Sequence, residues 1–401
     1  MTVHEFLQTH LLCPEQLDAQ AALSRLIADM ERGLRGEGNI PMLPSYLPAG
    51  IPLPKNTACR VLDAGGTNLR SARAVFDESG VCRIENLAKF PMPGTEGPMD
   101  FESFYGSLAD RAGTAEPKVG FCFSFNVEME ANLDGKLIAW CKEVQVPEAV
   151  GCYVGASLKD AMGPGCKSVH VLNDSVAAML GASAPDRQVR VGMILGTGVN
   201  VCYEERCEEI SKLPVSLPGK RMIISTEVGE FDGFPKNTFD LAHFDATEDP
   251  NLAHAEKQCA GGYLGGLICR VWQGAAAEGI LDDSFRNADF SLPQISDYLA
   301  GLSSPIPHRT EAIEIAKALI RRAAVIAAVL CAGPVVRCTA PSETAAIAME
   351  GSQYAKLQGF RDEFTRALRD LLTPRKINFA IIRTDNACLK GAALAAFAEP
   401  I

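Results

Sequence analysis

Two glycine-rich turns carry the residue types best suited to holding phosphate groups. The first spans Asp63-Ala-Gly-Gly-Thr-Asn-Leu-Arg70, and the second spans Gly196-Thr-Gly-Val-Asn200; each lies between two apolar segments. Glycines let the backbone turn tightly and present successive N–H groups, which form a concave site for an anion. One such turn alone is equally compatible with an ordinary hairpin. Two of them in one chain favour a paired site for the two ends of a polyphosphate.

Side chains of the first turn add to its binding capacity. Thr67 and Asn68 supply side-chain donors. Asp63, at the end of the preceding strand, is placed to hold the water shell of Mg²⁺. Two common nucleotide motifs are excluded. Gly163–Ser168 resembles the end of a P-loop, but Ala161 and Cys166 replace two required glycines, and no G-x-G-x-x-G follows a predicted strand.

A carboxylate suited to general-base chemistry follows a third apolar segment. Asn173-Asp174 comes directly after Val169–Leu172 and before an alanine-rich stretch. An aspartate at that point can cap the helix that follows. It can also serve phosphoryl transfer, which needs one carboxylate to orient the attacking hydroxyl and accept its proton. The residues alone leave both interpretations open.

Two rounds of strands and helices must position these groups. The first round predicts strands over 58–63, 69–76, 81–90, 119–125 and 169–172, with helices over 101–112 and 154–161. After a helix over 175–182, the second predicts strands over 189–195, 199–204, 222–226, 345–349 and 379–382, with helices near 253–279, 293–302, 310–331, 354–372 and from 389. Residues 1–40 are expected to be helical, and the prolines between 41 and 54 forbid regular helix there. Strand–glycine turn–strand thus occurs twice, which indicates two related α/β domains.

Bulk composition narrows the class of protein. At 401 residues the chain is long enough for two domains, and its net charge of −11 argues against nucleic acid or an anionic membrane as partner. The 14 cysteines are scattered without a C-x-x-C pair, which favours reduced, buried thiols over zinc ligands. No signal peptide is apparent. The longest apolar run, 323–336, is shorter than a membrane span, so we expect a buried core helix.

The chain resembles the hexokinase family from its first strand to its last helix. The matching segments, with the family pattern in parentheses, are Asp63–Arg70 (D-x-G-G-T-N-x-R), Phe121–Phe125 (G-F-T-F-S-F-P), Leu137–Lys142 (L-L-x-W-T-K), Leu172–Val176 (V-N-D-T-V), Leu195–Tyr203 (G-T-G-x-N-x-C-Y), Ser225–Phe231 (N-T-E-W-G-A-F), Glu256–Gly265 (E-K-x-x-x-G-x-Y-L-G), Glu350–Tyr354 (D-G-S-x-Y) and Lys390–Leu394 (K-G-A-A-L). Nine motifs in the family order make the resemblance specific.

The resemblance implies a fold and an activity. The fold is the two-lobed actin-like ATPase fold, ribonuclease H-like, each lobe a mixed sheet with flanking helices. We expect a large lobe of residues 1–56 and 175–386 and a small lobe of residues 57–174 and 387–401. The implied reaction transfers the γ-phosphoryl group of ATP, with Mg²⁺, to the 6-hydroxyl of a hexose: glucose by default, with fructose and mannose as alternatives. A cytoplasmic monomer or homodimer that binds hexose and ATP, without nucleic acid or membrane, is expected.

The resemblance also assigns roles residue by residue. Asp174 is the implied general base, and Lys142 the residue that stabilises developing charge. The residues implied to contact the sugar are Ser124, Phe125, Cys141, Lys142, Asn173, Asp174, Asn200, Glu227 and Glu256. Those implied to contact ATP are Asp63, Gly65, Gly66, Thr67, Asn68, Arg70, Gly196, Thr197, Gly198, Gly261, Gly351 and Ser352. Asp63 is also the implied Mg²⁺ residue, through water.

Several positions depart from the family pattern. Asn126 replaces the proline of the sugar loop, Cys141 a threonine and Val228 a tryptophan; Gln358-Gly359 replaces His-Pro, and Asn386–Leu389 replaces D-G-S-G. A thiol donates hydrogen bonds more weakly than a hydroxyl, so we expect changes in sugar range and nucleotide affinity.

Two alternative functions are considered. A non-catalytic sugar sensor should lack the general base or one of the two phosphate turns. This sequence keeps Asp174 and both turns. A kinase of the repressor-related sugar-kinase group should carry closely spaced zinc-binding cysteines and a histidine, which this sequence lacks.

Overall fold

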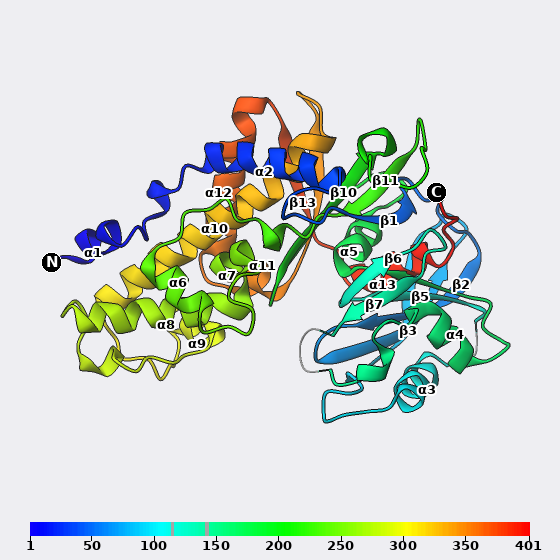
Figure 1. Ribbon diagram of the computed structural model, residues 1–401, viewed down its shortest axis with the longest axis horizontal. Helices are drawn as coiled ribbons and strands as arrows, with labels where there is room; N and C mark the ends of the chain where they lie inside the picture. The colour runs from blue at the N-terminus through cyan, green and yellow to red at the C-terminus, as the bar shows by residue number, and fades with distance from the viewer. Residues whose placement is uncertain (114–115, 141–143) are drawn as a thin grey trace.

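The computed structural model describes residues 1–113, 116–140 and 144–401. Two mixed sheets lie in separate halves of the molecule, joined through two helices at its centre (Figure 1). One sheet has five strands in the order β4-β3-β2-β5-β8, and the other has six in the order β1-β11-β10-β9-β12-β13. The predicted two-lobed α/β fold with mixed sheets is confirmed.

The five-stranded sheet carries the first glycine turn. Its strands are β2 (Thr57–Ala64), β3 (Asn68–Phe76), β4 (Cys82–Pro91), β5 (Lys118–Phe123) and β8 (Ser168–Leu172). Strands β2, β3 and β4 form an antiparallel meander, and β5 and β8 add in parallel on the other side of β2. Helices α3 (Phe101–Ala112) and α4 (Val154–Met162) share a hydrophobic cluster with one face of this sheet. A hairpin of β6 (Asn126–Met129) and β7 (Gly135–Ala139) lies beside it.

The six-stranded sheet repeats this topology around the second glycine turn. Its strands are β9 (Val191–Leu195), β10 (Val199–Arg206), β11 (Arg221–Ser225), β12 (Thr344–Glu350) and β13 (Asn378–Ile382), with β1 (Leu43–Pro48) at the edge. Again three antiparallel strands, β9 to β11, are followed by two parallel strands, β12 and β13. The same strand order in both sheets explains why each glycine turn heads one set of strands.

Most helices belong to the half with the six-stranded sheet; some pack on the sheet, and the others pack on those helices and extend away from it (Figure 1). They are α1 (Val3–Thr9), α2 (Ala19–Leu34), α6 (Thr238–Phe244), α7 (His254–Cys259), α8 (Gly261–Ala277), α9 (Leu292–Leu299), α10 (Thr310–Cys338), α11 (Ser352–Lys356) and α12 (Phe360–Leu372). Within the described ranges, α10 is the one helix long and apolar enough to span a membrane, and 83% of that apolar window is buried inside the protein. It is therefore the central core helix of this half.

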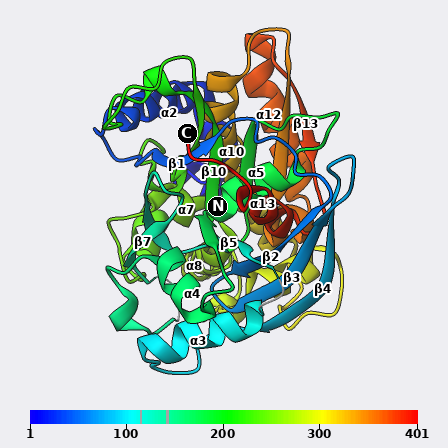
Figure 2. The ribbon, with the colours of Figure 1, turned by 90° about the vertical axis from the view of Figure 1, so that its right-hand side faces the viewer.

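Helices α5 (Asp174–Ala182) and α13 (Ala387–Ala395) lie between the two sheets (Figure 2). Helix α5 contacts the six-stranded sheet, α13 contacts the five-stranded sheet, and the two helices pack against each other. Their backbones approach so closely that a Cβ atom on Gly181 would lie 1.9 Å from the Ala387 oxygen. A Cβ atom on Gly391 would lie 1.8 Å from the Ala177 oxygen. Only glycine fits at these two positions, so the contact between the two halves is tight.

The structure corrects several of the predicted elements. Strand β1 occupies part of the proline-rich stretch, which is possible because an edge strand tolerates proline. The hairpin β6–β7 was not predicted. The single helix predicted over 253–279 is broken at Ala260, whose backbone is extended (φ −82°, ψ 154°). The helix over 354–372 is broken before Gly359, which has a positive φ of 78°. Helix α10 continues through Pro334 to Cys338.

Candidate active site

The first glycine turn joins β2 to β3 and exposes its tip. Its backbone is closed by a hydrogen bond from the Gly65 N–H to the Asn68 oxygen (2.9 Å). Thr67 and Asn68 are exposed, and Asn68 Nδ2 donates to Thr67 Oγ1 (2.8 Å). Below the tip, Asp63 is 8% exposed, and Arg70 Nε donates to its Oδ2 (2.7 Å). An Mg²⁺ held through water would share this carboxylate with the guanidinium of Arg70.

The second glycine turn joins β9 to β10 and is held by other glycines. The N–H of Gly261 donates to the Gly196 oxygen (2.8 Å), and that of Gly262 donates to the Thr197 oxygen (2.9 Å). Gly351 packs on the same turn with a φ of +119°, and a Cβ atom there would lie 2.1 Å from the Leu195 oxygen. Gly261 and Gly351, both predicted to contact ATP, are thus brought to the phosphate turn and support its backbone.

Asp174 is the first residue of α5, directly after the end of β8. The helix is capped by Asn173, whose Oδ1 accepts from the Ser175 N–H (2.8 Å) and Ser175 Oγ (2.7 Å). The capping role that the sequence left open for Asp174 therefore belongs to its neighbour. A carboxylate in the first turn of a helix is stabilised by the helix dipole. The position suits a group that must stay ionised to accept a proton.

Glu227 lies at the end of β11 within a compact hydrogen-bonded group. Its Oε1 accepts from Asn200 Nδ2 (2.6 Å) and from Ser225 Oγ (2.8 Å), and its backbone N–H donates to Asn200 Oδ1 (3.1 Å). Glu227 has a left-handed backbone conformation (φ 58°, ψ 44°), which a non-glycine residue adopts at a cost. Such strain is often found at functional sites, and here it directs the carboxylate to Asn200.

Three carboxylates lie close enough for their charges to interact. Burial raises the pKa of Glu227 to about 7; hydrogen bonds from Ser225 and Asn200 oppose this rise, and the charges of Asp174 and Glu256 add to it. Glu256, on α7, accepts from the Val199 N–H (2.9 Å) and so lies against the second glycine turn. The structure thus brings together Asp174 from one half and Glu227 and Glu256 from the other. Carboxylates gathered in this way can bind several sugar hydroxyls.

Other predicted sugar residues are placed differently. The Ser124 N–H donates to the Ala64 oxygen (3.1 Å), which puts this residue beside the first turn. Phe125 is only 5% exposed, with ring centroids 4.8 Å from Phe123 and 5.0 Å from Trp140. Its side chain belongs to the hydrophobic core, so a sugar contact from Phe125 would come from its backbone. Cys141 and Lys142 lie outside the described residues.

Ser352 and Glu350 mark the side predicted to hold adenosine. Ser352 is the first residue of α11. The N-cap residue is Gly351, so no side chain caps this helix. Burial raises the pKa of Glu350, and the charges of Arg383 and Arg70 lower it. Because Arg70 belongs to the five-stranded sheet and Glu350 to the six-stranded one, the electrostatic interaction between them connects the two halves.

Sequence reasoning missed some supporting residues. Ser225 bonds both Asn200 and Glu227, and it begins the Ser225–Phe231 motif, so the signal was present. Gln353, 4% exposed, donates from Nε2 to the Cys259 oxygen (2.6 Å) at the end of α7. Nothing in the sequence pattern indicated that contact. Over the described ranges, no group of three or more His, Cys, Asp or Glu side chains is arranged to hold a metal ion.

Two repeated sheets, a glycine turn at the head of each and facing carboxylates between them define a two-lobed kinase of the actin-like ATPase type. Family models described as hexokinase match residues 190–398 and 2–184. The chain therefore belongs to the hexokinase family, and it is a sugar kinase.

Individual relatives agree with this assignment. Chloroplastic hexokinase-4 of Oryza sativa subsp. japonica is 29% identical, over 94% of this chain and 85% of that protein. Hexokinase-2 of Saccharomyces cerevisiae is 26% identical, over 88% of this chain and 82% of that protein. The solved Schistosoma mansoni hexokinase complexed with glucose has the same fold, with a TM-score of 0.83, 21% identity and 99% of each chain covered. A ROK hexokinase from Thermus thermophilus is more distant in fold, with a TM-score of 0.55, 18% identity and coverage of 85% of this chain and 98% of that one.

Proposed function

We propose that this chain transfers the γ-phosphoryl group of ATP to the 6-hydroxyl of a hexose, with Asp174 as general base. The observation that carries the proposal is the position of Asp174. It starts α5 between the two halves, its neighbour Asn173 already caps the helix, and its charge acts on Glu227 across the site. A carboxylate so placed can orient a sugar hydroxyl and accept its proton, which is the acid–base chemistry that phosphoryl transfer requires.

In this proposal the hexose lies among the polar groups of both halves. Glu227, Asn200 and Glu256 bind ring hydroxyls from the side of the six-stranded sheet. Asn173 and the Ser124–Phe125 segment bind from the other side, together with Cys141 and Lys142. Support comes from the hydrogen-bonded group around Glu227 and from the contact of Glu256 with the second turn.

The two glycine turns bind the phosphates of ATP. Residues 65–68 with Arg70 form the first contact, and residues 196–198 form the second, supported by Gly261 and Gly351. The glycines fit this role at the second turn, where a Cβ atom on Gly198 would lie 2.6 Å from Glu256 Oε2. Asp63 would hold Mg²⁺ through water, and the ion would supply positive charge beside the phosphates. Ser352 lies on the adenosine side.

Glucose is the proposed default acceptor, with fructose and mannose as alternatives. The likeness in fold to a hexokinase complexed with glucose supports it. The departures at Asn126, Cys141 and Val228 bear on this choice. Val228 is fully buried, so the change from tryptophan there alters packing beneath Glu227.

The lobes and setting of the protein are proposed as well. Residues 1–56 and 175–386 form the large lobe, and residues 57–174 and 387–401 the small lobe, with α5 and α13 between them. We propose a cytoplasmic monomer or homodimer.

The experiment is a coupled assay of ADP release with glucose, fructose, mannose and glucosamine. At least one hexose is expected to be phosphorylated at its 6-hydroxyl, and Asp174→Ala should lower turnover by about 10³-fold or more. Asp174→Asn, which keeps the side-chain shape, should still bind the hexose. Near-native turnover of Asp174→Ala would refute the role of Asp174. Hexose binding without turnover in the wild type would instead indicate a sugar sensor.

A further inference from the structure

Helix α7 carries a proposed sugar ligand but cannot hold its own position. It has six residues, His254–Cys259, and it begins after Ala253, which has a left-handed conformation and no side-chain cap. A helix this short is not stable by itself, so tertiary contacts must fix its place. Its Glu256 faces the second glycine turn, where Oε2 accepts from the Val199 N–H (2.9 Å). The contacts of α7 therefore decide where this carboxylate lies.

On the opposite side of α7, Gln258 reaches into the core. Residues two apart on a helix point to nearly opposite sides, so Gln258 faces away from the glycine turn. Its side chain is 1% exposed. Gln258 Nε2 donates to Asp240 Oδ2 (3.2 Å) and to the Pro235 oxygen (3.0 Å). One buried amide thus joins α7 to α6 and to the loop that precedes α6.

The acceptor of that bond is held in a fixed geometry. Arg322 of α10 donates to both oxygens of Asp240, from Nη1 to Oδ1 (2.9 Å) and from Nη2 to Oδ2 (2.6 Å). Both residues are no more than 1% exposed. A buried ion pair of this kind adds little net stability compared with apolar side chains, because both charges lose their water. What it does supply is a rigid point of attachment.

We propose that Gln258, anchored by the Asp240–Arg322 pair, is a positioning residue that sets the place of Glu256 in the sugar site. The proposal rests on the proposed role of Glu256 as a ligand of the hexose hydroxyls. Asp240 and Arg322 act through Gln258, and Gln258 acts through α7; none of them touches the sugar.

The other contacts of α7 indicate whether hexose binding or nucleotide binding should change when Gln258 is replaced. Its C-terminal end is fixed by Gln353 at the Cys259 oxygen (2.6 Å) and by the bonds of Gly261 and Gly262 to the second turn. These bonds are independent of Gln258, so the phosphate turn keeps its support when Gln258 is replaced. Glu256 lies on the N-terminal side of those anchors, in the part of α7 that is attached by Gln258 to Asp240 (3.2 Å) and by His254 to Asp232 (2.6 Å). Loss of Gln258 should therefore weaken hexose binding more than nucleotide binding.

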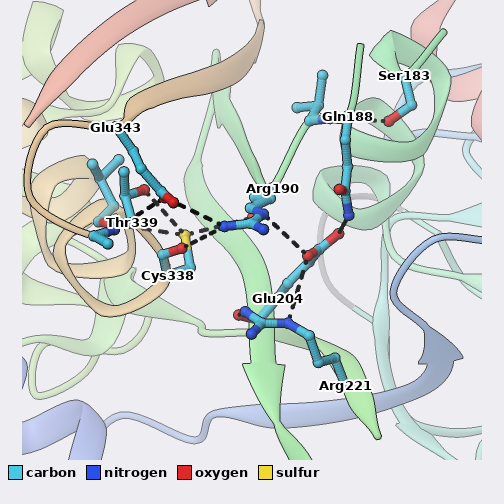
Figure 3. Close-up of polar contacts among 11 residues, drawn as sticks. Ser183, Gln188, Arg190, Glu204, Arg221, Cys338, Thr339 and Glu343 are labelled. Atoms are coloured by element: carbon cyan, nitrogen blue, oxygen red, sulfur yellow. Dashed lines mark hydrogen bonds and ion pairs between the residues drawn. The ribbon is translucent and has the colours of Figure 1, made fainter. Parts of the chain in front are cut away.

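The test compares Gln258→Leu with a matched control at the other end of β10. There Gln188 Nε2 donates to Glu204 Oε1 (2.9 Å), a nearly buried carboxylate flanked by Arg190 and Arg221 (Figure 3). Gln188→Leu also removes an amide–carboxylate bond, in this case from an exposed donor. Its acceptor Glu204 is four residues along the strand from Asn200 and so about 13 Å away from it. Steady-state kinetics are measured with hexose varied at saturating ATP, and with ATP varied at saturating hexose.

Gln258→Leu should raise the KM for the hexose about tenfold, because small misplacements of a binding group cost one to two orders of magnitude. Its KM for ATP and its kcat should stay within about twofold of the wild type. Gln188→Leu should change none of the three. An unchanged hexose KM in Gln258→Leu, or equal changes in both KM values, overturns the proposal. Gln258→Met, which fills the same space, serves if the leucine variant does not fold.

A third variant separates this inference from the proposed function. Glu256→Gln should raise the hexose KM at least as much as Gln258→Leu does. If Glu256→Gln has no effect, the role of Glu256 is wrong and the positioning role falls with it. If Glu256→Gln raises the KM and Gln258→Leu does not, only the positioning role is wrong.

Discussion

The pKa of Glu227 leads to a prediction about stability that requires no substrate. Burial raises that pKa from 4.5 to about 7. Below the lower value the group is protonated in both the folded and the unfolded chain, so its titration does not change the free energy of unfolding. Above the higher value it is charged in both, and the folded state carries the full cost of a buried charge, about 3 kcal/mol at 1.36 kcal/mol per pKa unit. Stability from this group is therefore lost as the pH rises between the two values.

The size of the effect follows from proton linkage. Between about pH 5 and about pH 8 the cost of the Glu227 charge grows by about 2.5 kcal/mol. Glu227→Gln removes the titration but keeps an oxygen that accepts from Asn200 and Ser225. The variant should therefore become more stable relative to the wild type as the pH rises, by about that amount.

The measurement is urea denaturation of both proteins across this pH range, with the difference in unfolding free energy plotted against pH. Titrating groups that do not interact with Glu227 cancel in the difference. Glu248→Gln, at an exposed position in the loop before α7, is the control and should give a flat difference. A difference for Glu227→Gln that varies by less than about 0.5 kcal/mol, or that changes in the opposite direction, would refute the proposed electrostatics of the site.

Three further predictions concern other parts of the molecule. Arg322→Leu leaves Asp240 buried without its ion-pair partner and should lower the unfolding free energy by about 3–5 kcal/mol, while adding Asp240→Leu should restore part of it, as chemical denaturation would show. Gly198→Ala places a Cβ atom 2.6 Å from Glu256 Oε2 and should raise the hexose KM about tenfold, whereas Gly165→Ala, with open space around it, should not. Removing Mg²⁺ with EDTA should abolish turnover, and Asp63→Asn should raise the Mg²⁺ concentration needed for half-maximal rate; an unchanged requirement would exclude Asp63.

The order of elements was largely predictable because strand periodicity and glycine turns are local signals. Both meanders, the two turns and the helix after Asp174 appear where the sequence indicated them. The errors have tertiary causes. Ala260 interrupts a helical pattern because the next two residues bond the Gly196 and Thr197 oxygens, which lie far away in sequence. Strand β1 forms within a proline-rich stretch because β11 offers it an edge.

The residues of the candidate site also fall into those that local sequence motifs predict and those that only the fold brings together. Asp174, Asn200, Glu227 and Glu256 could be named from short motifs. The motifs keep the first three beside the end of a strand, whereas Glu256 lies within α7. The residues that hold them in place could not be predicted from motifs. Gln258 and Gln353 lie in helical stretches with no pattern of their own, and only the fold brings them to α6 and to Cys259. For Phe125, packing against Trp140 buries the ring, which its motif did not indicate, and a sugar contact from this residue stays a prediction.

The departures from the family pattern are also not independent of one another. Cys122 stands where the sugar-loop pattern has threonine, and Cys388 stands where D-G-S-G has serine, 266 positions further along the chain. The structure brings the two thiols into hydrogen-bond contact, and Cys388 Sγ also donates to the Asp174 oxygen (3.8 Å). A change from hydroxyl to thiol at one position is thus met by the same change at its partner. The two thiols therefore lie together beside the backbone of Asp174, so a hydrogen bond from Cys388 to the Asp174 oxygen joins this pair to the start of α5.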